Sequence, residues 1–125
     1  MSNALLVKNY IADGAIPAYT IVKQNAADDH IVAAAAATDL FIGVTMELAA
    51  ATNERADVQM LGIAYVVAGA AVTRGNRVTA DASGRAVAAA PAGGVNNVVI
   101  GTALESATAA GDVIRVLLGL STIQG

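Results

Sequence analysis

The sequence contains no cysteine and no tryptophan, and it has one phenylalanine and one histidine among 125 residues. Without cysteine the chain can form neither a disulfide framework nor a thiolate nucleophile, and one histidine cannot build a multi-histidine zinc site. The seven lysines and arginines are scattered and the net charge is −3, so nucleic-acid binding through phosphate neutralisation is not expected. Neither a signal peptide nor a membrane span is predicted, because no basic segment precedes an apolar run and the longest uncharged stretch is too short.

Motifs for catalysis are missing as well. The sequence has no G-x-x-x-x-G-K-[ST] phosphate loop and no G-x-S-x-G nucleophile elbow. Glu47 with Glu105, and Asp57 with Asp112, could act as acid–base pairs, but solvent-facing strand ends or ion pairs between subunits explain them better. Residues 28–30 (Asp-Asp-His) are adjacent in one loop and cannot all point at one cation. We therefore expect no enzyme, no cofactor and no metal site.

Small apolar residues dominate what is present. Hydrophobic residues make up 56% of the chain but aromatic residues only 3%, so most of the apolar content is alanine and valine. Each of these side chains buries little area, and the core of a lone monomer gains modest stabilisation. With only 14% charged residues, part of the surface is expected to be covered by other subunits. A monomeric β protein with tightly packed alanines and glycine turns is the alternative.

Short β-forming runs separated by turn residues predict an all-β domain. The central stretch, Gly62–Gly84, is cut into such runs by Gly69, Gly75 and a turn at 81–84. About eight to ten short strands are expected, closed into a small barrel or packed as a sandwich, because both arrangements protect strand edges. The β-forming segments from which these strands are expected are residues 5–10, 19–24, the start of 30–37, 41–46, 55–61, 63–67, 70–73, 77–79, 84–90, 98–104 and 112–118.

The chain also repeats itself. Phe41-Ile-Gly-Val-Thr-Met-Glu47 corresponds to Val99-Ile-Gly-Thr-Ala-Leu-Glu105, with Gly43 and Gly101 separated by 58 positions. Leu61-Gly62 corresponds in the same order to Leu118-Gly119. The ordered succession favours an internal duplication of one β unit, and chance recurrence in a sequence rich in Ala, Val and Gly is the alternative.

The repeat predicts the organisation of the chain. We expect an N-terminal arm at residues 1–13, one β domain at residues 14–120 with halves at about 14–62 and 69–119, and a C-terminal tail at residues 121–125. The arm is either an ordinary edge strand or a segment that pairs with a neighbouring chain. Its candidate contact residues, toward another subunit or a partner, are Leu5, Leu6, Val7 and Tyr10.

An ordered series of segments resembles the capsid cement, or head decoration, proteins of tailed bacteriophages, and the resemblance extends over roughly Gly14 to Leu120. The segments are Gly62-Ile-Ala, Ala68-Gly69, Gly75-Asn-Arg-Val78, Asp81-Ala-Ser-Gly84-Arg-Ala-Val87, Ile100-Gly-Thr-Ala-Leu-Glu105, Ala110-Gly111-Asp-Val and Val116-Leu-Leu. The sequence departs from the pattern at Asn53, where glycine is expected, but asparagine tolerates a left-handed backbone. Part of that family has carried a recombinase label, which no nucleotide-binding loop of this chain supports.

The resemblance has consequences for fold and function. It implies a β-barrel-like or β-tulip-like body that forms a trimer. It further implies a virion protein, made in the bacterial host cytoplasm, that binds the major capsid protein on the outer surface of the head and stabilises the expanded shell. A small β-barrel binding module for carbohydrate or cell-surface adhesion remains the alternative. Such a module would need aromatic platforms, for which the chain offers only Tyr10, Tyr19, Tyr65 and Phe41.

Overall fold

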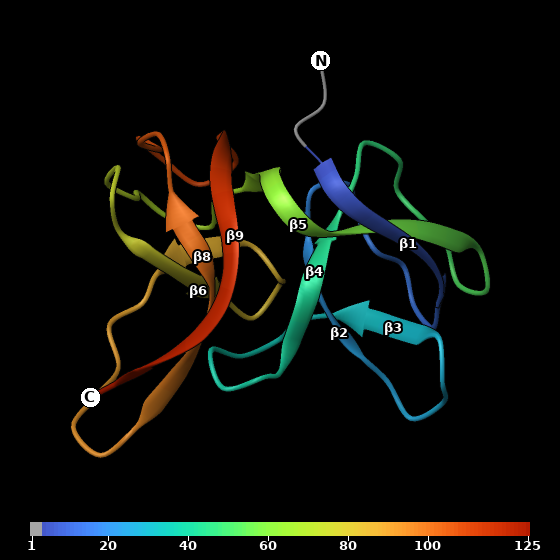
Figure 1. The fold of residues 1–125 in the computed structure, drawn as a ribbon, viewed down its shortest axis with the longest axis horizontal. Coiled ribbons are helices and arrows are strands. Elements are labelled where there is room, and N and C mark those ends of the chain that lie inside the picture. Colours follow the sequence, from blue (N-terminus) through green and yellow to red (C-terminus); the bar gives the residue numbers. More distant parts are fainter. Residues whose placement is uncertain (1–3) are drawn as a thin grey trace.

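The computed structural model describes residues 4–125, and every regular element in that range is a β-strand (Figure 1). The predicted all-β class is therefore confirmed, and the described residues contain no helix that could span a membrane. The strands are β1 (Ala4–Ala12), β2 (Ile21–Gln24), β3 (His30–Ala33), β4 (Phe41–Thr45), β5 (Arg55–Val67), β6 (Arg77–Ala80), β7 (Ala86–Ala88), β8 (Asn96–Ala103) and β9 (Val113–Gln124).

The first half of the chain closes into a ring of five strands. β1 pairs in parallel with β3, β3 pairs with β2, β2 with β4, and β4 with β5, all antiparallel after the first step. β5 then pairs antiparallel with β1, from Ile11↔Arg55 to Ala4↔Gly62, which completes the circuit. Because every strand of this ring has a neighbour on each side, the ring protects its edges as a small barrel does.

The second half repeats this circuit. β5 continues beyond Gly62 and pairs antiparallel with β9, β9 pairs with β8, β8 with β6, and β6 with β7. A parallel bridge between Ala68 and Ala86 then connects β7 to the residue that follows β5. This bridge corresponds to the parallel pairing of β1 with β3 in the first half. Strand β5 therefore belongs to both circuits, and the stretch around Tyr65 runs from one half into the other as the repeat predicts.

Backbone details outside the strands match between the halves too. The isolated bridge Ile16↔Ala50 has its counterpart in Val72↔Ala107. Three residues of the first half have a left-handed backbone, and each corresponds to a glycine of the second half that has one as well. The pairs are Tyr19 (φ 56°) with Gly75, Asp29 (φ 61°) with Gly84, and Asn53 (φ 70°) with Gly111. The predicted left-handed turn at Asn53 is thus present, and the matching geometry supports duplication over chance recurrence.

Three segments differ from the sequence-based expectation. Residues 55–61 and 63–67 form one strand instead of two, because Gly62, with a φ of 99°, carries the chain through without a break. Residues 70–73 form no strand, and only Val72 makes a bridge. Residues 121–124, expected to be a tail, extend β9, because β8 begins at Asn96 and offers them partners from Val99↔Ser121 to Asn96↔Gln124.

The hydrophobic core consists of two clusters of buried side chains. One cluster lies inside the first ring and includes Tyr10, Ile16, Ile31 and Val58. A larger cluster joins Ile21, Phe41 and Val44 of the first half to residues of the second half, among them Ala64, Val78, Ile100 and Ile114. Because the larger cluster spans both circuits, the halves form a single packed body.

Two glycines lie where neighbouring strands approach one another closely. Gly43 in β4 and Gly101 in β8 are repeat counterparts, and a Cβ at either position would collide with the backbone of the neighbouring strand, at Gln59 and Leu117 respectively. We expect Gly43→Ala and Gly101→Ala each to lower the free energy of unfolding by about 2 kcal/mol, as overpacking in a core does. Chemical denaturation measures this.

Gly14→Ala is the matched control, because a Cβ there meets nothing within 4 Å and the backbone is not left-handed. If all three variants were equally stable, the close approach of the strands would not be what requires glycine at positions 43 and 101.

Candidate functional site: an apolar contact surface on β1, β5 and β9

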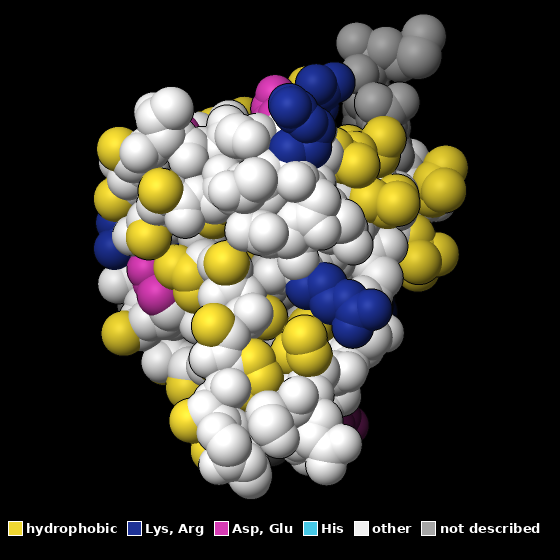
Figure 2. All heavy atoms as spheres, turned by 90° about the vertical axis from the view of Figure 1, so that its left-hand side faces the viewer, with side chains coloured by type: hydrophobic (Ala, Val, Ile, Leu, Met, Phe, Trp, Pro, Cys, Tyr) yellow, Lys and Arg dark blue, Asp and Glu magenta, His cyan; other side chains and the backbone are white. Residues whose placement is uncertain are grey.

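Exposed apolar side chains gather where β1, β5 and β9 adjoin. We define the apolar patch as Leu5, Leu6, Val7, Leu61 and Leu117, whose exposed fractions are 80%, 47%, 42%, 50% and 49%. The pairing register brings them together, since Leu6 lies opposite Leu61 and Leu117 lies opposite Ile63, the next residue on the same face of β5. Figure 2 shows hydrophobic side chains gathered at the upper right, toward the start of the described chain. Exposed apolar side chains that adjoin one another are common at interaction sites, so these residues form the candidate contact surface.

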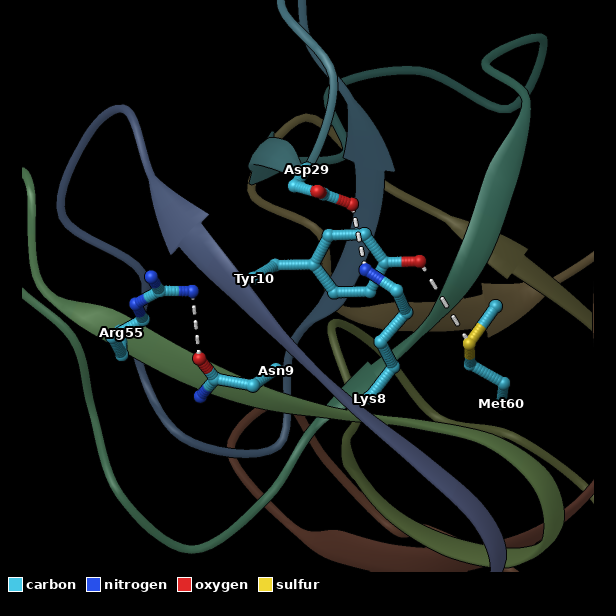
Figure 3. Close-up of polar contacts among 6 residues, drawn as sticks. All are labelled: Lys8, Asn9, Tyr10, Asp29, Arg55 and Met60. Carbon is cyan, nitrogen blue, oxygen red and sulfur yellow. Dashed lines mark hydrogen bonds and ion pairs between the residues drawn. The ribbon is translucent and has the colours of Figure 1, made fainter.

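Polar contacts fix β1 within its own chain (Figure 3). The Lys8 ammonium lies 2.6 Å from a carboxylate oxygen of Asp29, and it sits 4.2 Å from the centre of the Tyr10 ring. The Arg55 guanidinium donates to Asn9 Oδ1 at 3.1 Å. The Asn9 amide donates in turn to Asp57 Oδ1 at 3.1 Å. These contacts, with the pairing to β5, place Leu5, Leu6 and Val7 on a strand of the ring. Their outward presentation therefore requires no second chain.

Tyr10 differs from the other three predicted contact residues. Its side chain is 4% exposed, it packs in the core of the first ring, and its hydroxyl donates to Met60 Sδ at 3.9 Å. The phenol ring of Tyr10 points into the core because alternate residues of a strand point to opposite sides, and Tyr10 shares the buried side of β1 with Ala12. Tyr10 is therefore a core residue and is removed from the candidate contact residues. Leu5, Leu6 and Val7 lie on the surface.

Sequence reasoning missed Leu61 and Leu117. Arg55 and Asp57 already indicate the exposed face of β5. Leu61 is expected on that face as well, because every second residue of a strand points to the same side. The same reasoning places Gln59 on that face, yet Gln59 is buried. Its amide donates to the carbonyls of Leu61 and Ile63, at 3.1 and 2.9 Å, beside the bend at Gly62. Leu117 could be recognised only from the pairing of β9 with β5.

A second set of charged contacts lies where β1 ends. Asp13 accepts hydrogen bonds from His30 Nδ1 at 2.6 Å and from the Asn25 amide at 2.9 Å. These two bonds, the one from His30 first, lower the pKa of the Asp13 carboxyl below its ordinary value. The hydrogen bond between Lys8 and Asp29 likewise raises the pKa of Lys8 and lowers that of Asp29. Charged groups therefore tie β1 and the turn after it to the loop that carries Asp29 and His30.

Several of the remaining carboxylates accept hydrogen bonds from the backbone or form surface ion pairs. Glu105 accepts from the Arg115 amide at 2.9 Å and pairs with its guanidinium at 3.5 Å. Asp112 accepts from the Thr108 amide and hydroxyl, and these bonds lower the pKa of its carboxyl. Glu47 lines a shallow pocket of about 130 Å³ with Arg55 and Asp57. Within residues 4–125 no three metal-ligating side chains come together.

Comparisons with known proteins agree with this architecture. A family model described as phage cement protein matches residues 6–118. The crystal structure of the head fiber gp8.5 N base of bacteriophage phi29 is similar, with a TM-score of 0.72 and 22% sequence identity, over 96% of this chain and 98% of that one. At this identity the likeness shows a common fold. Among curated proteins no sequence matches significantly.

Acid titration tests the clip that Asp13 forms with His30 and Asn25. Because the folded pKa of Asp13 is lower than the unfolded one, its contribution to stability is complete above the unfolded pKa of about 3.9 and is lost as the pH falls through the folded pKa. We therefore expect the free energy of unfolding to fall less steeply in Asp13→Asn than in the wild type between about pH 5 and pH 3. Urea denaturation at a series of pH values measures this.

Asp28→Asn is the control, because the Asp28 side chain makes no ion pair or hydrogen bond with residues 4–125. Equal pH dependence in Asp13→Asn and the wild type would mean that the clip does not contribute.

Proposed function

Because the chain belongs to the phage cement protein family, we propose that it binds the outer surface of a phage head and stabilises the expanded shell. The family establishes the coarser statement that this is a structural protein of the phage head. The finer statement rests on the apolar patch, whose exposed side chains are carried by paired strands. The partner that we propose for it is the major capsid protein.

Burial of the patch can supply the binding free energy. Covering one exposed leucine or valine side chain contributes roughly 1.5–3 kcal/mol. The five side chains of the patch start about half exposed or more, so their burial gives several kcal/mol before the entropy of association is subtracted. The patch carries no ionisable side chain of its own, so no charge is stripped of water without a partner.

Stabilisation of the shell then follows from linkage. A protein that binds only the assembled, expanded shell lowers the free energy of that state by an amount that grows with the logarithm of its concentration over its Kd. A contact that bridges two capsid subunits also resists their separation. This mechanism requires neither catalysis nor a cofactor, and we propose that the protein is not an enzyme and contacts neither nucleic acid nor a membrane.

We also propose that the protein acts as a homotrimer. Large apolar side chains are exposed away from the patch, namely Leu40 at 78%, Leu48 at 78% and Leu120 at 54%, and contacts between subunits would cover such residues. Three identical chains around a closed symmetry axis would present three patches, and simultaneous attachment through several sites multiplies a modest single-site affinity.

Substitutions in the patch test the proposed attachment. In the double variant Leu6→Ser, Leu61→Ser, two cross-strand neighbours become polar on the surface, and we expect the affinity for expanded capsids to fall about 100-fold with the fold intact. Co-sedimentation with capsids that lack the protein measures the affinity. Val95→Ser is the control, because Val95 is an apolar side chain of similar exposure (40%) that lies outside the patch and outside the residues proposed for subunit contacts. Equal losses in both variants would remove the patch from the proposal.

The oligomer has a separate test. Light scattering coupled to size-exclusion chromatography should give three times the 12.4 kDa mass of one chain. A monomer that still decorates capsids would contradict the trimer and leave the attachment standing.

A further inference from the structure

A groove between the two halves of the molecule is not part of the apolar patch. It has a volume of about 280 Å³ and is lined by Pro17, Ala18, Thr20, Val67, Ser83 and Arg85. These residues come from three segments: the connection between β1 and β2, the end of β5, and the turn between β6 and β7. Backbone hydrogen bonds from Val67 to Tyr19 at 3.0 Å and from Ile21 to Gly84 at 2.8 Å hold the walls together. The groove is therefore preformed by both halves of the repeat.

Two tyrosines adjoin the residues that line this groove. Tyr19 lies between the lining residues Ala18 and Thr20, and Tyr65 lies two positions before Val67 on the same face of β5. Their rings meet edge to face, with centroids 6.1 Å apart and planes at 61°. In such a pair the ring that offers its edge keeps both of its faces uncovered. Tyr65 is 51% exposed, and neither hydroxyl has a hydrogen-bond partner among residues 4–125.

The backbone at Tyr19 is strained for a residue of its kind. Its φ is 56°, in the left-handed region that bulky side chains rarely adopt, and the counterpart position in the second half is Gly75, with a φ of 94°. Glycine would satisfy the same turn without strain. A tyrosine at this position therefore opposes local stability, and strain of this kind occurs preferentially where a side chain is required for binding.

Polar groups line the opposite side of the groove. Arg85 is held by Asp81 through its Nε atom at 3.2 Å, and its two terminal amino groups make no further hydrogen bond within the described chain. The Asp81 carboxylate accepts from the Ser83 and Arg85 amides, at 2.8 and 3.0 Å, and is thereby occupied. The Arg85–Asp81 pair is electrically neutral overall, so the groove offers oriented donors and a hydroxyl without a net charge that would favour an anion.

We propose that this groove binds a neutral hexopyranose unit of a surface glycan. A pyranose ring has an apolar face of C–H groups that stacks on the face of an aromatic ring, and hydroxyls at its edge that accept from a guanidinium and exchange hydrogen bonds with Ser83 and the tyrosine hydroxyls. The polar lining residues and the neighbouring tyrosines offer these two kinds of surface, and the volume of about 280 Å³ lies just below the range typical of pockets for drug-sized ligands. The apolar patch is a separate surface, so capsid attachment and sugar binding can be tested independently.

The experiment titrates the full chain with four probes: the methyl α-pyranosides of glucose, galactose and mannose, and N-acetylglucosamine. Amide chemical shifts in ¹H–¹⁵N spectra should change and saturate at residues 18–20, 65–67 and 83–85 for at least one probe. A Kd on the order of 1–10 mM is expected for so small a ligand. Absence of saturable shifts at these residues with all four probes would overturn the proposal.

Three variants separate binding from folding. Tyr65→Ala should weaken the affinity at least tenfold, whereas Tyr65→Phe should retain most of it, because the ring remains. Tyr19→Gly should also weaken binding, yet its free energy of unfolding should equal or exceed that of the wild type, because the left-handed turn then matches Gly75. Unchanged binding in Tyr65→Ala and Tyr19→Gly would overturn the role of the tyrosines. Reduced stability in Tyr19→Gly with unchanged binding in Tyr65→Ala would show that the pair is purely structural.

Discussion

The structure depends on one strand that two circuits use in common. β5 pairs with β1 and β4 before Gly62 and with β9 after it, so both halves of the molecule close through the same stretch of backbone. A ring of five short strands encloses little volume, and here the enclosed side chains are mostly alanine, valine and isoleucine. Sharing β5 lets the larger hydrophobic cluster extend across both halves, which compensates for the small area that each side chain buries.

Comparison of counterpart positions in the two halves shows where glycine is required and where the halves differ. Gly43 and Gly101 occupy counterpart positions at which a neighbouring strand leaves no room for a Cβ. At three left-handed positions the second half uses glycine, whereas the first half uses Tyr19, Asp29 and Asn53. Turns that are formed by glycine in the second half therefore carry side chains in the first half. Asp29 there pairs with Lys8 of β1, and Tyr19 lies between two residues that line the groove and contacts the Tyr65 ring.

Much of this fold could be predicted from the sequence, because short β-forming runs and turn glycines are local signals. The all-β class, most strands and the left-handed turn at Asn53 follow from residue type alone. Burial of Tyr10 and Gln59 does not, because it depends on which strand lies beside β1 and on the bend at Gly62. The extension of β9 through residues 121–124 depends likewise on β8 starting early enough to pair with it. For the contact surface, Leu5, Leu6 and Val7 could be named from their place near the start of the chain, whereas Leu117 required the register of β9.

Attachment through the apolar patch is the central functional claim, and imaging of a decorated head tests it most directly. An electron cryo-microscopy reconstruction of an expanded capsid carrying this protein should place the ends of β1 and β5 against the outer surface of the shell. Leu5, Leu6 and Leu61 should then lie within van der Waals distance of the major capsid protein. A reconstruction in which these side chains face solvent, or in which the protein lies inside the shell, would contradict the account.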